Sequence, residues 1–281
     1  MHVVVHPSAR GYWDEVGDFL LRREAENCLP IGIARTLIDT PERYPRFHLF
    51  ALKEAGRVVG AGWMTPPHPL GLSAVPEAAI PLLVKHARSL GEPVRALVGP
   101  KATAVAFKDA WLATHGCAVA SQMAQRIFQL SSVVRPPPVE GSFRKATASD
   151  RSVLEGWHHD FIVDCNITAD GIDAVKACEI GIKTGSRYVW QVDEEVVAMV
   201  GYGGETPSGV RVSWVYTPPA RRGRGYASAL VASMSQKLLD EGRSFCFLYT
   251  DLANPTSNGI YQRIGYQPVC DSMHFTFAPT G

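Results

Sequence analysis

The segment Arg211–Leu230, with the sequence RVSWVYTPPARRGRGYASAL, predicts a strand, a basic turn and the start of a helix in succession. Arg211–Tyr216 alternates in polarity and is rich in β-branched and aromatic residues, as strands are. Pro218 and Pro219 lack the amide donors that further strand pairing needs. Beyond Tyr226, apolar residues recur on one face at helical spacing, at Ala227, Leu230, Val231, Met234 and Leu238.

The turn between this strand and this helix has the chemistry of an anion site. The first N–H groups of a helix have no backbone acceptor and carry partial positive charge. Gly223 and Gly225 remove Cβ atoms that would keep a phosphate from these amides. Arg221, Arg222 and Arg224 add three guanidinium groups suited to phosphate. A pyrophosphate is therefore the expected ligand, and the alternative is a solvated basic turn.

Two other phosphate motifs fit this turn less well. A dinucleotide-binding fingerprint needs a further glycine where this chain has Ser228, and it follows a βαβ unit instead of a strand meander. A P-loop needs a Gly-Lys-Ser/Thr sequence, which does not follow here.

A second informative segment is Phe247–Tyr266, FLYTDLANPTSNGIYQRIGY. Asn254 followed by Pro255 is a helix N-cap with proline at the first helical position. On the predicted helix Ser257 and Tyr261, four residues apart, share a stripe that we expect to face a cleft. The helix is expected to end at Ile264 and to face the core with Ile260 and Ile264.

The proline-rich segment 133–141, VVRPPPVEG, divides the chain, because three consecutive prolines continue neither a helix nor an interior strand. Both halves then show the same order of predicted elements, which indicates an internal duplication. We therefore expect an α/β protein with two tandem domains, 1–132 and 142–281. Each is expected to be a mixed, mostly antiparallel sheet flanked by helices, and 269–277 is expected to be the last strand of the second.

The helices that open the two halves differ in the prediction. One helical stretch, Trp13–Leu37, is expected in the first half, and two shorter ones, Ser149–Phe161 and Asp170–Gly181, in the second. Ser149 or Asp150 is a plausible N-cap of the first of these, and Asp170 of the other.

Arg222–Ala227 (RGRGYA) resembles the R/Q-x-x-G-x-G/A signature of the GNAT acyltransferases. Phe247–Tyr266 is similar to the other cofactor segment of that family, including its terminal Y-x-x-x-G-aromatic pattern. The resemblance covers about 187–277 well, extends to Phe143 by layout, and reaches the first half only through the repeat. It implies two GNAT-like domains, with acetyl-CoA as acyl donor in the second and no metal.

In that family the strands on either side of the turn diverge and acetyl-CoA lies between them. By resemblance, the end of the first strand would offer backbone groups to the pantetheine arm, at Val215, Tyr216 and Thr217. A main-chain N–H near Val215 would polarise the thioester carbonyl. The pyrophosphate would lie against Arg222, Gly223, Arg224, Gly225, Tyr226, Ala227 and Ser228. Further cofactor contacts are expected from Asn254 and Ser257.

Tyr261 matches the tyrosine with which many GNAT enzymes protonate the departing CoA thiolate. A phenol with a pKa of about 10 is protonated at neutral pH and can donate to a thiolate. The alternative is a half-buried tyrosine with a solvated hydroxyl. The acceptor amine must lose a proton, and Glu205 is our first candidate for its base. Weaker candidates are His158, His159, Asp160 and Asp164.

The first half departs from the family pattern at both functional elements. Where the repeat places the basic turn it has Pro69–Ala74 (PLGLSA), with one glycine and no arginine. Where the repeat places the tyrosine, between Ala110 and Leu112, it has none. We expect a degenerate copy that binds no cofactor of its own and helps wall the acceptor site.

Composition excludes several other classes of function. The formal net charge of +1 argues against an ordinary nucleic-acid binder. The N-terminus lacks a signal-peptide pattern, and no run approaches the roughly 18 apolar residues of a membrane helix, so we expect a cytoplasmic protein. The six cysteines contain no C-x-x-C pair that would indicate zinc or redox chemistry.

We therefore expect an N-acetyltransferase that acts on a primary amine of a small molecule or a protein, as a monomer or a homodimer. One alternative is a CoA-binding sensor or scaffold without turnover. Another is a small-molecule acetyltransferase similar to mycothiol synthase.

Overall fold

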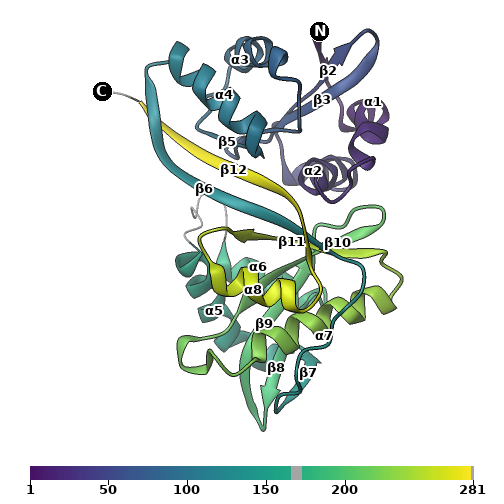
Figure 1. Ribbon diagram of the computed structural model, residues 1–281, viewed down its shortest axis with the longest axis vertical. Coiled ribbons are helices and arrows are strands. Elements are labelled where there is room, and N and C mark those ends of the chain that lie inside the picture. The colour runs from purple at the N-terminus through teal and green to yellow at the C-terminus, as the bar shows by residue number, and fades with distance from the viewer. Residues whose placement is uncertain (166–172, 280–281) are drawn as a thin grey trace. The chain divides into compact units, whose positions relative to one another are not determined.

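The computed structural model describes residues 1–165 and 173–279 (Figure 1). This part of the chain forms two compact units. Of the described residues, unit 1 comprises 1–127 with 270–279, and unit 2 comprises 128–165 with 173–269.

The two halves of the chain have the same order of elements, as the duplication predicts. The first half contains β1 (His2–His6), α1 (Ala9–Leu21), α2 (Cys28–Asp39), β2 (His48–Glu54), β3 (Arg57–Met64), β4 (Leu70–Leu72), α3 (Ile80–Arg88), β5 (Ala96–Pro100), α4 (Lys101–Thr114) and β6 (Cys117–Leu130). The second half contains β7 (Ser142–Lys145), α5 (Arg151–Asp164), α6 (Ala174–Lys183), β8 (Arg187–Val192), β9 (Glu195–Gly203), β10 (Gly209–Tyr216), α7 (Tyr226–Asp240), β11 (Phe245–Asp251), α8 (Pro255–Arg263) and β12 (Gln267–Pro279). Short 3₁₀ turns lie at Pro41–Arg43, Glu77–Ala79, Ala148–Asp150 and Pro219–Arg221.

Strand pairing repeats as well. In unit 1 the pairs β1–β2, β2–β3 and β3–β4 are antiparallel, and β4–β5 is parallel. In unit 2 the pairs β7–β8, β8–β9 and β9–β10 are antiparallel, and β10–β11 is parallel. Each unit is thus a mixed, mostly antiparallel sheet with helices packed on it, which confirms the predicted fold class.

The last strands depart from the expected boundaries. β12, the last strand of the second half, pairs antiparallel with β5 in unit 1, and its Met273 and Phe275 are buried in the core of that unit. Phe128 and Leu130, at the end of β6, belong instead to the core of unit 2. The second compact unit therefore ends at Val269 and not at the end of the chain. The partner of each strand is a segment far away in the chain, so the local pattern of residues does not specify it.

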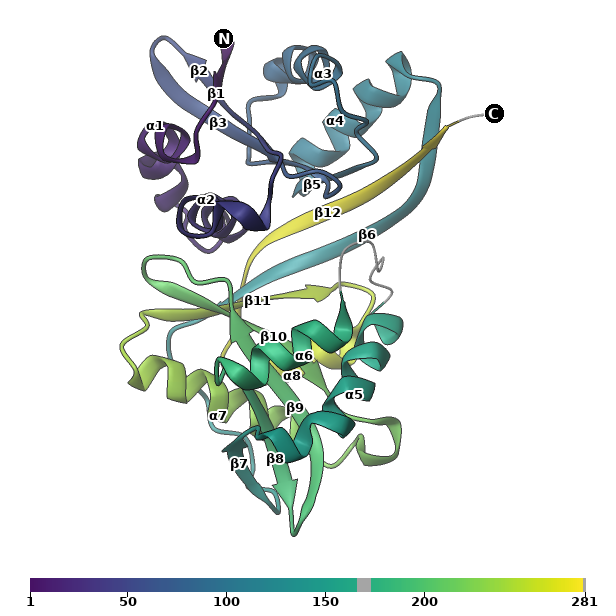
Figure 2. The same cartoon turned by 180° about the vertical axis from the view of Figure 1, so that it is seen from behind.

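Helices cover both faces of each sheet, because alternate residues of a strand point to opposite faces. In unit 2, Tyr188 and Trp190 of β8 pack with α7, whereas Val189 packs with α5 and α6. Figures 1 and 2 show α7 on one face of this sheet and α5 and α6 on the other. In unit 1, Phe50 packs with α3 and α4, and Leu49 packs with α1 and α2.

Three local predictions need correction. The expected helix Trp13–Leu37 is two helices, α1 and α2, separated by a turn. The side chain of Asp173 accepts the Lys176 N–H at 2.9 Å and caps α6, while the expected cap Asp170 lies outside the described residues. The segment 133–141, expected as a proline-rich linker between the two domains, lies within unit 2, where the Val134 N–H donates to the Ile264 carbonyl at 3.0 Å.

Candidate active site

β10 and β11 begin as a parallel pair and then separate. Their pairing is confined to Gly209–Arg211 with Phe245–Phe247, although β10 continues to Tyr216 and β11 to Asp251. Backbone groups at the far end of β10 are therefore not used by β11, which leaves room between the two strands.

A bulge interrupts the other edge of β10. Ser213 pairs with Gly201 of β9, but the next pair is Tyr216 with Met199, so two residues of β10 lie opposite one of β9. Trp214 has a left-handed backbone with φ of 56°, which is uncommon for a residue with a side chain. Bulges of this kind redirect side chains and release backbone groups from the ladder, here at Trp214 and Val215.

The basic turn has the conformation that its glycines predict. Gly223 and Gly225 have φ of 80° and 83°, in the left-handed region that glycine adopts without strain. Gly225 immediately precedes α7, and its carbonyl accepts the Ala229 N–H at 3.0 Å. The N–H groups of the first turn of α7 therefore have no helical acceptor and point out of the helix at the basic turn.

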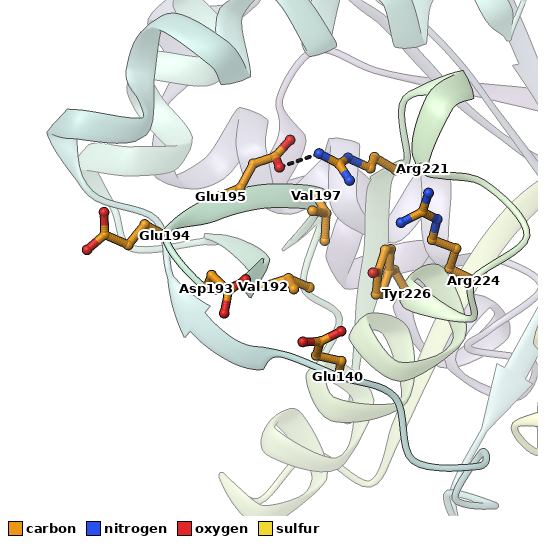
Figure 3. A pocket seen from close by; sticks show the side chains of 9 residues that line it. All are labelled: Glu140, Val192, Asp193, Glu194, Glu195, Val197, Arg221, Arg224 and Tyr226. Carbon is orange, nitrogen blue, oxygen red and sulfur yellow. Dashed lines mark hydrogen bonds and ion pairs between the residues drawn. The ribbon is translucent and has the colours of Figure 1, made fainter.

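The three arginines of the turn have different surroundings. Arg222 donates through Nη2 to Asp164 of α5 at 2.7 Å and through Nε to the Thr217 carbonyl at 2.8 Å. Arg221 forms an ion pair with Glu195 of β9, beside a pocket of about 470 Å³ (Figure 3). Arg224 lines this pocket and also the larger cleft described next, and among the described residues it has no ion pair.

One cleft of about 770 Å³ extends along the end of β10, the basic turn and α8. Every residue that the resemblance assigned to acetyl-CoA lines it. These residues are Val215, Tyr216, Thr217, Arg222, Gly223, Arg224, Gly225, Tyr226, Ala227, Ser228, Asn254 and Ser257. The Thr217 hydroxyl is buried and has no hydrogen-bond partner among the described residues, as expected of a polar group at a ligand site.

Tyr261 lies in the wall of the same cleft, on α8. Its side chain is 8% exposed, and its ring packs 6.5 Å from Phe128 and 5.9 Å from Tyr266, measured between ring centroids. Burial, with a smaller effect of Cys165, raises the pKa of the Tyr261 phenol above its usual range. Tyr261 therefore keeps its proton at neutral pH.

Several cleft residues were not predicted from the sequence. From α5 and α8 these are Phe161, Cys165, Thr256, Ile260 and Arg263. Ile260 was expected in the core, but it lines the cleft and only partly packs on the core. Thr256, Ile260 and Arg263 of α8 follow the i, i+4, i+7 spacing of one helix stripe, next to that of Ser257 and Tyr261. Helical spacing therefore carried a signal for them. The α5 residues had no such signal. Burial raises the pKa of the Cys165 thiol to about 11, so it is uncharged and a poor nucleophile.

Glu205 does not line the cleft. It forms an ion pair with Arg243 at 2.7 Å and precedes the start of β10, whereas the cleft lies at the other end of that strand. At about 3.3 Å per residue, these positions are roughly 25 Å apart. The structure therefore gives no support to Glu205 as the base for the acceptor.

The other candidate bases also have defined places. His158 is fully buried, and burial with the nearby charge of Arg187 lowers its pKa to about 4. Asp160 accepts a hydrogen bond from the Tyr216 hydroxyl at 3.3 Å, and Asp164 is paired with Arg222. His159 is exposed, 3.9 Å from Asp160.

Within residues 1–165 and 173–279, no group of three or more His, Cys, Asp or Glu side chains is arranged to hold a metal ion. In the same residues, every helix is too short or too polar to cross a membrane.

The comparison with protein families agrees with this geometry. Residues 154–266 match the acetyltransferase (GNAT) family. This part of the chain is a GNAT domain. It contains the bulged strand, the basic turn and α8, and thus the whole cleft wall from Phe161 to Arg263. No curated protein matches the chain significantly.

Solved structures extend the likeness to both units. A GNAT acetyltransferase from Colwellia psychrerythraea has a TM-score of 0.61 and 10% identity, covering 99% of this chain and 100% of that one. A GNAT acetyltransferase from Sphaerobacter thermophilus has a TM-score of 0.63 and 12% identity, covering 99% and 96%. A tandem GNAT protein from clavulanic acid biosynthesis has a TM-score of 0.57 and 13% identity, covering 100% and 99%. At these identities the likeness concerns the fold, which is a tandem GNAT fold.

Proposed function

We propose that unit 2 binds acetyl-CoA in the cleft and transfers its acetyl group to a primary amine. The observation that carries the proposal is that all residues assigned to the cofactor line one cleft together with Tyr261. Unit 1 is then a degenerate copy without its own cofactor.

The cleft supplies a distinct group for each part of the donor. The N–H groups at the start of α7, with Arg222 and Arg224, suit the pyrophosphate. Binding requires Arg222 to exchange Asp164 for phosphate. The register shift between Ser213 and Tyr216 takes Val215 out of the regular pairing with β9, which supports the Val215 N–H as the donor to the thioester carbonyl.

Transfer proceeds by direct attack. The amine nitrogen forms a bond to the thioester carbon while a backbone N–H stabilises the developing oxyanion. The carbon–sulfur bond then breaks, and the Tyr261 hydroxyl protonates the CoA thiolate. The acceptor nitrogen releases one proton to solvent, and the Tyr261 phenolate takes one proton back from solvent, so the enzyme returns to its starting state. Because the amine attacks the thioester itself, no cysteine is acylated.

A calorimetric titration with acetyl-CoA tests the proposal. We expect one site per chain in the wild-type protein and in an Arg46→Ala variant, whose arginine is an exposed residue of unit 1. Binding should be lost in the double variant Arg222→Ala, Gly225→Val. The valine would add a side chain at a φ of 83° and bring Cβ within 2.9 Å of Val139.

Each other outcome has a definite meaning. Absence of binding to the wild type would overturn the proposal, and two sites per chain would show that unit 1 is not degenerate. With binding established, release of CoA thiol over a panel of small amines and peptides identifies the acceptor class. Tight binding without thiol release would favour a sensor or scaffold.

A further inference from the structure

Arg187 is a buried cation that the proposed chemistry does not use. It lies on β8 and is 3% exposed. Its Nε has no hydrogen-bond partner, and no carboxylate pairs with it among the described residues. Burial lowers the pKa of the guanidinium to about 10, so it stays charged at neutral pH. A buried charge without a partner is costly, and such groups call for an explanation.

The backbone makes room for this side chain. Arg187 lies directly opposite Gly201 of β9, and a Cβ on Gly201 would be 1.7 Å from Nη1 of Arg187. A Cβ on Gly181 of α6 would be 2.9 Å from Nη2. The guanidinium therefore fills a slot between β9 and α6 that two glycines leave open. Gly201 also pairs with Ser213 of β10, so the slot leads across the sheet to the bulge.

The Trp214 ring contacts the Arg187 guanidinium at the end of this slot. The Arg187 guanidinium carbon lies 5.3 Å from the centroid of the Trp214 ring, within the range of a cation–π contact. The same indole packs on α5, with centroid distances of 4.6 Å to His158 and 5.1 Å to Phe161. Figure 2 shows α5 and α6 on this face of the β10 strand.

This placement reverses the alternation of β10. Val210 and Val212 pack with α7, so regular alternation would direct Trp214 and Tyr216 to the same face. Instead Trp214 contacts the rings of α5, and Tyr216 packs with Trp157 of α5 at 6.0 Å. The reversal depends on the left-handed backbone of Trp214, which needs support from its surroundings.

We propose that Arg187 is a positioning residue for acyl transfer, which holds the Trp214 indole against α5 and thereby fixes the bulge that directs the Val215 N–H to the thioester carbonyl. This inference rests on the proposed binding of acetyl-CoA. Arg187 does not touch the substrate and acts only through Trp214 and the backbone that follows it.

The test observes the thioester carbonyl directly and needs no acceptor. Carbonyl-¹³C-labelled acetyl-CoA is bound to the full chain, and the shift of its carbonyl resonance from the free value is recorded. We expect the wild type to show a clear shift, because a hydrogen bond polarises the carbonyl. Arg187→Met should move the resonance at least halfway back to the free value, with the acetyl-CoA Kd changed less than threefold.

Trp214→Phe and the double variant Arg187→Met, Trp214→Phe complete a cycle. The double variant should lose no more of the shift than the larger single variant, because both residues act through one contact. Arg243 is a half-buried arginine outside the cleft, and its Arg243→Met variant is the matched control, which should keep the full shift. The melting temperature of Arg187→Met should be unchanged or higher, since an apolar side chain replaces a buried unpaired charge.

The outcomes separate this inference from the proposed function. A wild type that does not bind acetyl-CoA overturns both. A wild type that binds with a shifted carbonyl, together with an Arg187→Met variant that keeps the shift, overturns the role of Arg187 alone. If Arg187→Met does not fold, the Trp214→Phe variant tests the proposal instead. A carbonyl shift in Trp214→Phe as large as in the wild type would contradict it.

Discussion

The turns after β4 in unit 1 and after β10 in unit 2 have the same place in the repeat and different surroundings. β4 has only three residues, and beyond it the Val75 N–H donates to the Thr103 hydroxyl of α4 at 3.2 Å. β10 has eight residues, and its far end lies beyond the pairing with β11. A short strand joined to the following helix leaves little space, whereas a long, bulged strand leaves a cleft.

The two turns also differ in charge and backbone freedom. Ser73–Pro76 (SAVP) contains neither arginine nor glycine, and an acidic residue, Glu77, follows it. The internal repeat in the sequence predicts this turn at Pro69–Ala74, but in the structure Leu70–Leu72 form β4 and the turn follows them. The comparison teaches that the repeat preserves topology, while strand length, the bulge and the turn residues decide where an anion can bind.

The largest effect that separates the units is expected in their cores. Leu83→Ala in unit 1 and Leu230→Ala in unit 2 each remove a buried leucine and should lower the stability of their own unit by about 3 kcal/mol. Hydrogen exchange followed peptide by peptide measures this for each unit. Acetyl-CoA should restore protection in the Leu230→Ala variant only. Equal loss of protection in both units for either variant would show that they unfold together.

A smaller effect is expected on the transfer rate, from substitutions in α8 of unit 2 and at the corresponding position in α4 of unit 1. Tyr261→Phe should lower the rate of transfer to the acceptor identified by screening by about 100-fold, because the thiolate loses its proton donor. Calorimetry should find its acetyl-CoA Kd unchanged. Trp111→Phe on α4 is the control from unit 1 and should keep the wild-type rate. A Tyr261→Phe rate within threefold of the wild type would exclude the general-acid role.

The smallest effect distinguishes two helix caps. Asn254 accepts the Ser257 N–H at 3.0 Å in unit 2, and Ser8 accepts the Gly11 N–H at 3.2 Å in unit 1. Replacing either with alanine should destabilise its helix by about 1 kcal/mol, measurable by hydrogen exchange. Asn254→Ala alone should also weaken acetyl-CoA binding, because Asn254 lines the cleft. Equal acetyl-CoA affinity in the two variants would contradict a cofactor contact at Asn254.

Much of the site could be predicted because its signals are local. Gly223 and Gly225 predict a left-handed turn, and Asn254 followed by Pro255 predicts the start of a helix. Glu205 could not be judged in this way, because its distance from the cleft depends on the length and direction of β10. Phe161 lies on α5 and Cys165 directly follows that helix, whose approach to the cleft has no sequence signature.

The sequence by itself determined the order of the elements, the alternation that gives each sheet two buried faces, and the left-handed basic turn, because these depend on neighbouring residues. Tertiary structure decided which unit holds each last strand, since the partner of a strand depends on segments far away in the chain, such as β5 for β12. It also decided the slot for Arg187, which forms only when Gly181, Gly201 and Trp214, distant along the chain, come together.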